Sequence, residues 1–380
     1  MTAARKVFRG GRIFDGAVLH EGCALVLSGS CVDAILPETE APRSSDVVDL
    51  GGDILSPGFV DLQVNGGGGV MFNDDPTLET LSRIAEAHRN LGCAAILPTL
   101  ITDTPDVLGA ALEAARAAID AKVPGIAGLH LEGPHLAPAR RGAHAGDLIR
   151  PMSSANLTIL LEAATRLPVL MVTLAPESVR EEQVLMLTEG GVVVSLGHTD
   201  ADYETCRRYA AAGATSATHL FNAMGGLSAR APGLVGAVLA DGSLSAGLIA
   251  DGVHVDPAVM GAAIRAKSGP GAIYLVSDAM AAAGSDLTRF TLNGRPVKRH
   301  DGRLTLGDGT LAGADLDLVR AIRVLVTEVG TDLARALAMA TSIPAGVAGI
   351  SGAGRLRPKS DTVLVRIRHD LSACTPVAGG

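Results

Sequence analysis

Four side chains in the central part of the chain could together hold a metal ion and hydrolyse an amide. They are Glu132, His198, His219 and Asp278. One carboxylate and two imidazoles suit Zn²⁺ or a similar divalent ion, with a fourth position left for a water molecule. The ion would lower the pKa of that water towards ~7 and polarise a bound carbonyl group. Asp278 could then take a proton from the water and pass it to a leaving amine.

The surrounding sequence predicts the elements that would carry these residues. Between residues 54 and 341, short apolar runs alternate with amphipathic stretches such as residues 78–92 and 106–121. We expect strands in eight such runs: 59–64, 93–98, 126–132, 169–176, 192–198, 214–220, 245–254 and 273–279. Strands that alternate with helices predict parallel βαβ units. Eight units favour an α/β fold, a closed (β/α)8 TIM-type barrel.

In such a barrel the polar residues that end the runs would meet. They are Gln63 and Asn65, Glu132, His198, His219, Asp251 with His254, and Asp278. The carboxyl ends of all barrel strands open on one face, where catalytic groups lie. Taken singly, each residue has an ordinary structural interpretation, such as a buried histidine or a helix cap. Their occurrence at the ends of several predicted strands favours a metal site instead.

Both ends of the chain are rich in short predicted strands. Residues 1–53 contain three strand-like segments, and a similar segment follows Gly354. Neither end has enough apolar surface to be stable alone. We therefore expect one small sheet domain built from residues 1–53 and 342–380, beside a barrel of residues 54–341.

The composition excludes several classes of protein. The 380 residues include 32 Lys and Arg against 40 Asp and Glu, which gives a net charge of −8. Nucleic-acid binding needs clustered basic residues, so we expect no nucleic-acid partner. No apolar run approaches the ~18 residues of a membrane span, and the first residues lack the apolar core of a secretion signal. These features predict a cytoplasmic protein without a membrane partner.

The scarcity of aromatic residues limits how a ligand could be recognised. They make up 2% of the chain, and there is no Trp. Stacking of a sugar or base on aromatic rings is therefore not expected. Recognition of a small ligand must depend on polar contacts.

Six segments of the central region resemble a known family when taken in order. They are PGFVDLQVNGGGG (57–69), HLEGPHLAPARRGAH (130–144), SLGHTDADYE (195–204), ATHLFNAMGGLSARAPGLVGAVL (217–239), IADGVHVDP (249–257) and LVSDAMAAAG (275–284). Together they resemble the N-acetylglucosamine-6-phosphate deacetylases of the amidohydrolase superfamily. The resemblance implies that the terminal domain is a β-sandwich. It also implies hydrolysis of the acetamide of N-acetyl-D-glucosamine 6-phosphate to D-glucosamine 6-phosphate and acetate, in amino-sugar catabolism and cell-wall sugar recycling.

The resemblance also implies catalytic roles for individual residues. Glu132, His198 and His219 match the metal ligands of the family. Asp278 matches its catalytic aspartate. His144 matches a histidine that approaches the substrate and steadies the carbonyl oxygen.

Four further matches concern the substrate and its phosphate. His254 matches a substrate-binding histidine, and Asn222 and Ala223 match residues whose main chain contacts the ligand. Arg230 matches an arginine that meets the phosphate, in the family often across a dimer interface. The resemblance therefore implies a homodimer, or a dimer of dimers, that binds a small amino-sugar phosphate.

One position departs from the binuclear members of the superfamily. They have His-x-His at the end of the first strand, where this chain has Gln63, Val64 and Asn65. Carboxamides are weak metal ligands and are better suited to hydrogen bonding a sugar or a water molecule. We therefore predict one divalent ion per subunit, with Zn the first choice and Fe, Mn or Co compatible with the same ligands.

Two other interpretations remain open from the sequence. One is a related amidohydrolase, such as a deacetylase for N-acetylgalactosamine 6-phosphate or a hydrolase of cyclic amides. The other is a scaffold protein on an inactive barrel, although such a protein would be expected to have lost a ligand or the aspartate. Acetate release with and without a chelator would separate these cases.

Overall fold

The eight predicted strands form one parallel sheet in the computed structural model, which describes residues 5–44 and 46–377. They are β8 (Phe59–Val64), β11 (Cys93–Ile101), β12 (Leu129–Glu132), β13 (Leu170–Leu174), β14 (Val193–Leu196), β15 (Ser216–Ala217), β16 (Ser245–Leu248) and β17 (Ile273–Leu275). Neighbours in the sheet follow the order of the chain. A parallel bridge between Val64 and Ala279 joins the first strand to the segment after the last, which closes the sheet. The predicted (β/α)8 barrel is confirmed.

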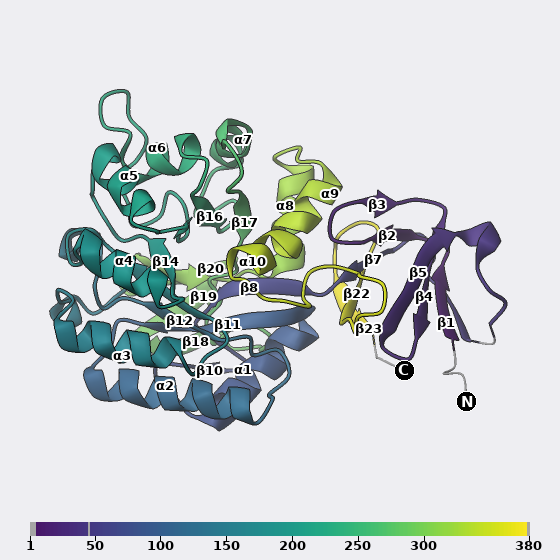
Figure 1. Ribbon diagram of the computed structural model, residues 1–380, viewed down its shortest axis with the longest axis horizontal. Helices are drawn as coiled ribbons and strands as arrows, with labels where there is room; N and C mark the ends of the chain where they lie inside the picture. Colours follow the sequence, from purple (N-terminus) through teal and green to yellow (C-terminus); the bar gives the residue numbers. More distant parts are fainter. Residues whose placement is uncertain (1–4, 45, 378–380) are drawn as a thin grey trace.

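Helices follow the strands and cover the outside of the barrel (Figure 1). They are α1 (Leu78–Asn90), α2 (Pro105–Asp120), α3 (Ser154–Ala164), α4 (Glu181–Glu189), α5 (Tyr203–Ala211), α6 (Gly233–Ala240), α7 (Pro257–Ala266), α8 (Leu318–Thr327), α9 (Leu333–Ala340) and α10 (Ser342–Val347). The two helices predicted from periodicity are α1 and α2, and Thr77 and Thr104 cap their first turns. Among the described residues, none of the helices has the length and apolarity needed to cross a membrane.

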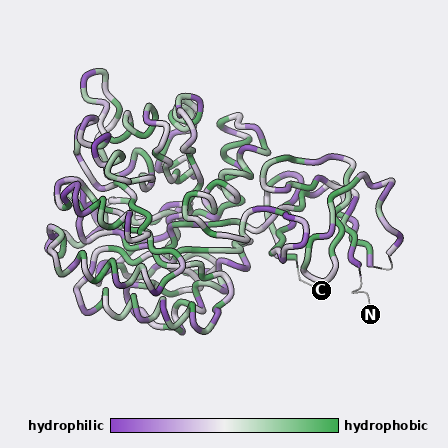
Figure 2. Tube along the Cα trace, in the orientation of Figure 1, coloured by the Kyte–Doolittle hydropathy of each residue, from purple (hydrophilic) through white to green (hydrophobic). Residues whose placement is uncertain are grey.

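The apolar core lies between the barrel strands and the helices outside them. Leu81 and Ile84 on α1 are buried against the barrel, and all residues of β8 are buried. Figure 2 shows hydrophobic residues along the barrel strands and hydrophilic ones at the periphery. Strands buried on both faces read as nearly continuous apolar runs, which is why the sequence showed them so clearly.

Segments from both ends of the chain form a small domain with two sheets. The first sheet contains β5 (Cys31–Pro37), β4 (Cys23–Ser28), β1 (Arg5–Arg9) and β6 (Asp46–Asp49). The second contains β23 (Cys374–Val377), β22 (Leu364–Ile367), β7 (Ile54–Pro57), β2 (Arg12–Phe14) and β3 (Leu19–His20). Phe8, Leu25, Leu55 and Leu364 belong to one buried cluster that includes residues of both sheets. The terminal strands therefore share one core.

The exact domain limits stay a prediction. Strand β7, at residues 54–57, pairs with β2 and β22 of the small domain. Helix α10, at residues 342–347, packs against β8 and β17 of the barrel. The chain thus crosses between the two domains close to the predicted limits at 53/54 and 341/342.

Two sheets were not expected from the sequence, and the smaller one pairs β9 (Gly66–Gly67) with β10 (Val70–Met71). After β17 the chain forms an antiparallel sheet of β18 (Arg289–Leu292), β19 (Arg295–His300), β20 (Arg303–Thr305) and β21 (Leu311–Ala314). Asn293 and Asp301 each precede a Gly and have a φ of 49°, the conformation of tight hairpin turns. Buried Leu292, Val297 and Leu304 pack with Met280, so this sheet is fixed to the segment that follows Asp278.

Candidate active site

A cavity of about 250 Å³ opens at the carboxyl ends of the barrel strands. Its walls combine loops that follow several strands with the sheet β18–β21. The lining residues are Asn65, Ile101, Glu132, Gly142, Ala143, His144, His198, His219, Asn222, Ala223, Ile249, His254, Asp278, Met280, Leu292, Thr310, Leu311 and Gly313. The structure therefore brings together most of the residues that the sequence singled out, from strands far apart in the chain.

Three electron-donating atoms converge at the base of this cavity. Glu132 Oε1 lies 3.1 Å from His219 Nε2 and 3.3 Å from His198 Nε2. The two Nε2 atoms are 3.0 Å apart. All three side chains are buried, and their ligand atoms form one compact group. This donor set, one carboxylate and two imidazoles, fits a divalent cation such as Zn²⁺.

The orientation of His198 supports this assignment. Its Nδ1 lies 2.8 Å from the carbonyl oxygen of Arg140, which can only accept a hydrogen bond. Nδ1 therefore carries the proton, and Nε2 presents a lone pair to Glu132 and His219. A ring N–H donated to a backbone carbonyl is the usual support for a histidine that binds a metal.

Gln63 supports Glu132 rather than reaching into the cavity. Its Nε2 donates to Glu132 Oε1 over 3.1 Å, and its Oε1 accepts from the Thr218 hydroxyl over 2.9 Å. Both ends of the carboxamide are thus used to hold a candidate ligand in place. Its predicted contact with substrate stays a prediction.

Asp278 lies beside the donor group at the end of the last strand. Asn65 Nδ2 donates to its Oδ1 over 2.7 Å. Burial and the repulsion of Glu132 raise the pKa of Asp278 to about 6. A carboxylate with a raised pKa near neutrality is suited to take and return a proton.

His144 forms another wall of the cavity. It is buried, and its Nε2 lies 3.7 Å from Glu132 Oε2. Its ring meets that of His198 edge to face, with 4.5 Å between centroids. Burial and the neighbouring His198 lower the pKa of His144 to about 3, so the ring is neutral at physiological pH.

The residues matched to substrate binding divide into two groups. Asn222, Ala223 and His254 line the cavity. His254 Nδ1 pairs with Asp251 Oδ2 over 2.7 Å, which directs the other ring nitrogen away from that carboxylate. Arg230 is exposed and lies outside the lining of this cavity. Its phosphate contact therefore stays a prediction.

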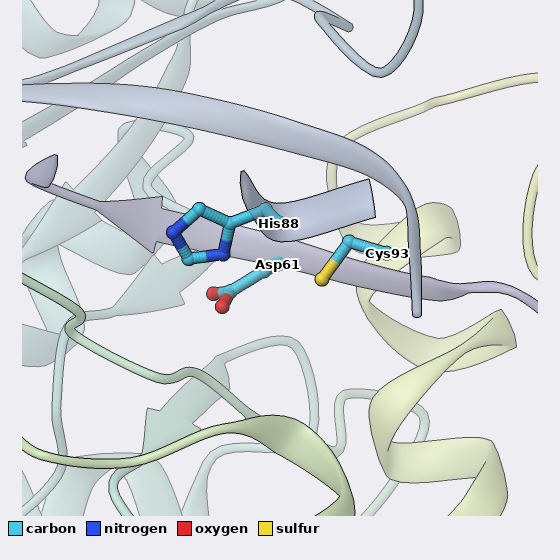
Figure 3. Close-up of side chains that lie close together, drawn as sticks. All are labelled: Asp61, His88 and Cys93. Carbon is cyan, nitrogen blue, oxygen red and sulfur yellow. The ribbon is translucent and has the colours of Figure 1, made fainter. Parts of the chain in front are cut away.

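A second buried group of potential metal ligands lies outside the lining of the cavity. Asp61, His88 and Cys93 have ligand atoms within 4.8 Å of one another (Figure 3). His88 Nε2 lies 3.0 Å from the carbonyl oxygen of Gly66, to which it donates. Asp61 accepts the N–H groups of Gln63 and Ser277. The bonds of Asp61 connect the first barrel strand to the residue before Asp278.

Backbone strain is also present at this face of the barrel. His198 and Asp278 have φ values of 49° and 48°, and Ala223 has 49°. Non-glycine residues rarely adopt this region, and such strain is found mainly at functional sites. Of these three residues, His198 is a candidate metal ligand, and Asp278 and Ala223 line the same cavity.

Several residues that line the cavity, or that contact its lining, were not expected from the sequence. Thr102 contacts His144, and Leu292, Thr310 and Leu311 come from the additional sheet. The sheet had a signal, because the dipeptides Asn293-Gly294 and Asp301-Gly302 separate short alternating runs. Thr102 had none, since it follows an apolar strand without a motif around it.

The fold and the donor group together define a class of protein, the barrel enzymes that hydrolyse bonds with a bound metal ion. A model of the amidohydrolase family matches residues 54–375. The chain therefore belongs to the amidohydrolase family.

Individual relatives agree with this assignment. The chain is 43% identical over 338 residues to an N-acetylgalactosamine-6-phosphate deacetylase of Shewanella sp. (strain ANA-3), covering 88% of this chain and 85% of the relative. It is 34% identical to the N-acetylglucosamine-6-phosphate deacetylase of Haemophilus influenzae, covering 86% and 85%. The crystal structure of N-acetylglucosamine-6-phosphate deacetylase from Pasteurella multocida superposes with a TM-score of 0.92 at 34% identity, covering 99% and 98% of the two chains.

Proposed function

We propose that the protein hydrolyses the acetamide of N-acetyl-D-glucosamine 6-phosphate to D-glucosamine 6-phosphate and acetate. The observation that carries the proposal is the convergence of Glu132, His198 and His219 beside Asp278 at the carboxyl face of the barrel. The names and coverage of the relatives support the substrate class. Glu132, His198 and His219 would hold one divalent ion, with Zn²⁺ the first choice and Fe, Mn or Co compatible.

The side chains of the cavity divide the reaction between them. A divalent ion held by the three ligands would supply Lewis acidity, which polarises a carbonyl and activates water. Asp278 takes a proton from the attacking water and returns it to the nitrogen as the C–N bond breaks. His144 donates from Nε2 to the carbonyl oxygen, where negative charge develops. Asn65 holds Asp278 in position for both proton transfers.

Besides holding Asp278, Asn65 can also bind the substrate. Its Oδ1 is buried and has no hydrogen-bond partner among the described residues. An unsatisfied buried acceptor beside a cavity is suited to receive a hydrogen bond from the amide or a hydroxyl of the sugar. The substrate would then provide the hydrogen bond that Asn65 Oδ1 lacks in the protein alone.

The phosphate would be met at the rim of the cavity. His254 and the main chain of Asn222 and Ala223, residues that line the cavity, would provide this contact. Arg230, exposed in this chain, would reach the phosphate of a neighbouring subunit in a homodimer or dimer of dimers. The planar guanidinium suits such a contact because it donates two parallel hydrogen bonds. A cytoplasmic location accompanies this proposal as a prediction.

A second candidate substrate is N-acetyl-D-galactosamine 6-phosphate, because the relative with 43% identity is named for it. Acetate release should be measured with both sugar phosphates and with unphosphorylated N-acetylglucosamine. The proposal predicts the highest kcat/KM for N-acetyl-D-glucosamine 6-phosphate and a large loss without the phosphate. A higher kcat/KM for the galactosamine compound would assign the second candidate. Equal rates with and without phosphate would exclude both.

A further inference from the structure

Thr102 contacts His144 through two separate groups. Its backbone N–H donates to His144 Nδ1 over 3.3 Å, and its hydroxyl oxygen lies 2.8 Å from the same nitrogen. Thr102 follows β11 directly, whereas His144 belongs to the loop after β12. Both side chains are buried, with exposed fractions of 1% and 5%.

These contacts determine which nitrogen of His144 carries the proton. A backbone N–H can only donate, so Nδ1 must accept and cannot be protonated. The hydroxyl of Thr102 therefore also donates to Nδ1. A neutral imidazole has one ring proton, which must then lie on Nε2. This nitrogen is on the side of the ring that approaches Glu132, 3.7 Å from its Oε2.

Gly133 makes this arrangement possible. A Cβ atom at residue 133 would lie 2.3 Å from the Thr102 hydroxyl oxygen, far inside van der Waals contact. Gly133 also has a φ of +87°, which side chains rarely tolerate. The residue after the metal-ligand candidate Glu132 thus leaves room for the hydroxyl that contacts His144.

We propose that Thr102 is a positioning residue, which holds His144 in the tautomer with its proton on Nε2. The proposal rests on the role of His144 as a donor to the substrate carbonyl. With Nδ1 accepting from Thr102, Nε2 has no free lone pair. His144 then acts neither as a further metal ligand nor as a general base, in spite of its place beside Glu132 and His198.

Kinetics of four variants test whether Thr102 acts through His144. Thr102→Val should lower kcat by about tenfold, the effect of one lost hydrogen bond, and leave KM within about twofold. Thr102→Ser, which keeps the hydroxyl, should restore most of kcat. In the His144→Gln background, Thr102→Val should cause no further loss. An additional loss of similar size in the double variant, or failure of serine to restore activity, would overturn the proposal.

A spectroscopic measurement tests the tautomer without any substrate. In the zinc-loaded protein labelled with ¹⁵N at histidine, the His144 signals can be identified by their absence from His144→Gln. The proposal predicts an unprotonated Nδ1 and a protonated Nε2. A proton on Nδ1 would contradict it, whatever reaction the protein catalyses. If the proposed function is wrong, the kinetic test is lost with it. The spectroscopic test depends only on the contact between Thr102 and His144.

Discussion

Asn65 Nδ2 donates a hydrogen bond of 2.7 Å to Asp278 Oδ1, so the end of the first barrel strand holds the carboxylate at the end of the last. The bond leaves the other oxygen of Asp278 available for a water molecule. It uses the amide nitrogen of Asn65 and leaves its Oδ1 without a hydrogen-bond partner among the described residues. The hydrogen bond that orients the proposed base therefore also joins the first barrel strand to the segment after the last one.

Replacement of Asp278 tests its role as the base. Asp278→Asn keeps the size of the side chain and removes its ability to take a proton. We expect kcat to fall by about 10²- to 10⁴-fold, the usual contribution of general acid–base catalysis. Metal content, measured by elemental analysis, should stay near that of the wild type. Near-normal turnover in the variant would show that another group is the base.

The pH profile provides an independent test of the same residue. Asp278 must be ionised to accept a proton, and its pKa is raised to about 6 by burial and by Glu132. A divalent ion held by Glu132 would offset part of that repulsion, so we expect kcat/KM to rise with pH to a plateau with its midpoint at or below about 6. Asn65→Leu removes a hydrogen bond that favours the ionised form, so its profile should move to higher pH. A shift to lower pH would contradict the assigned contact.

Gly133→Ala tests the space around the Thr102 hydroxyl. The new methyl group would lie 2.3 Å from Thr102 Oγ1 and would require an unfavourable φ of +87°. We expect a loss of about 1–3 kcal/mol in the free energy of unfolding, measured with denaturant, and a lower kcat. Gly346→Ala in α10 is the matched control, because its Cβ would meet nothing within 4 Å. Equal effects at both positions would refute the steric argument.

Asp61 predicts a particular dependence of stability on pH. Burial raises its folded-state pKa to about 7, against an ordinary value of 3.8. The native protein thus binds more protons than the unfolded chain in this range. Its free energy of unfolding should fall as pH rises from about 4 to about 7, by up to about 1.4 kcal/mol per pH unit.

The variant Asp61→Asn isolates this contribution. It cannot titrate, so its stability relative to the wild type should increase between pH 5 and pH 8. The buried His88, whose pKa is lowered to about 4, makes an opposite contribution that is present in both proteins and cancels in the difference. Denaturant unfolding of both proteins at pH 5 and pH 8 measures this difference in the free energy of unfolding. A stability difference that does not change with pH would mean that Asp61 is ionised throughout.

The sequence predicted the barrel because buried parallel strands are continuous apolar runs that alternate with amphipathic helices. It also predicted Glu132, His198 and His219, since polar residues at the ends of such runs are unusual. It could not predict the contact of Thr102 with His144, because two loops from different strands create it. The positive φ values of His198 and Asp278 are likewise imposed by the fold. The sheet β18–β21 could have been found from Asn293-Gly294 and Asp301-Gly302.

The partner of Arg230 is a different case. The residue is exposed in one chain, and its proposed contact needs a second one. A single sequence has no information on which surface of one copy meets another. The oligomeric state and the position of Arg230 against the phosphate are therefore predictions for a structure of the assembled protein.

The central claim is that Glu132, His198 and His219 hold a divalent ion on which deacetylation depends. The most direct test is to measure metal content and acetate release from N-acetyl-D-glucosamine 6-phosphate in the same samples. The samples are the wild type in three states, as purified, after chelation and after return of Zn²⁺, and the variant His219→Asn. The account predicts that activity and metal are lost together, return together in the wild type, and stay absent in the variant. Acetate release at an undiminished rate from metal-free protein, or none from protein reloaded with metal, would contradict it.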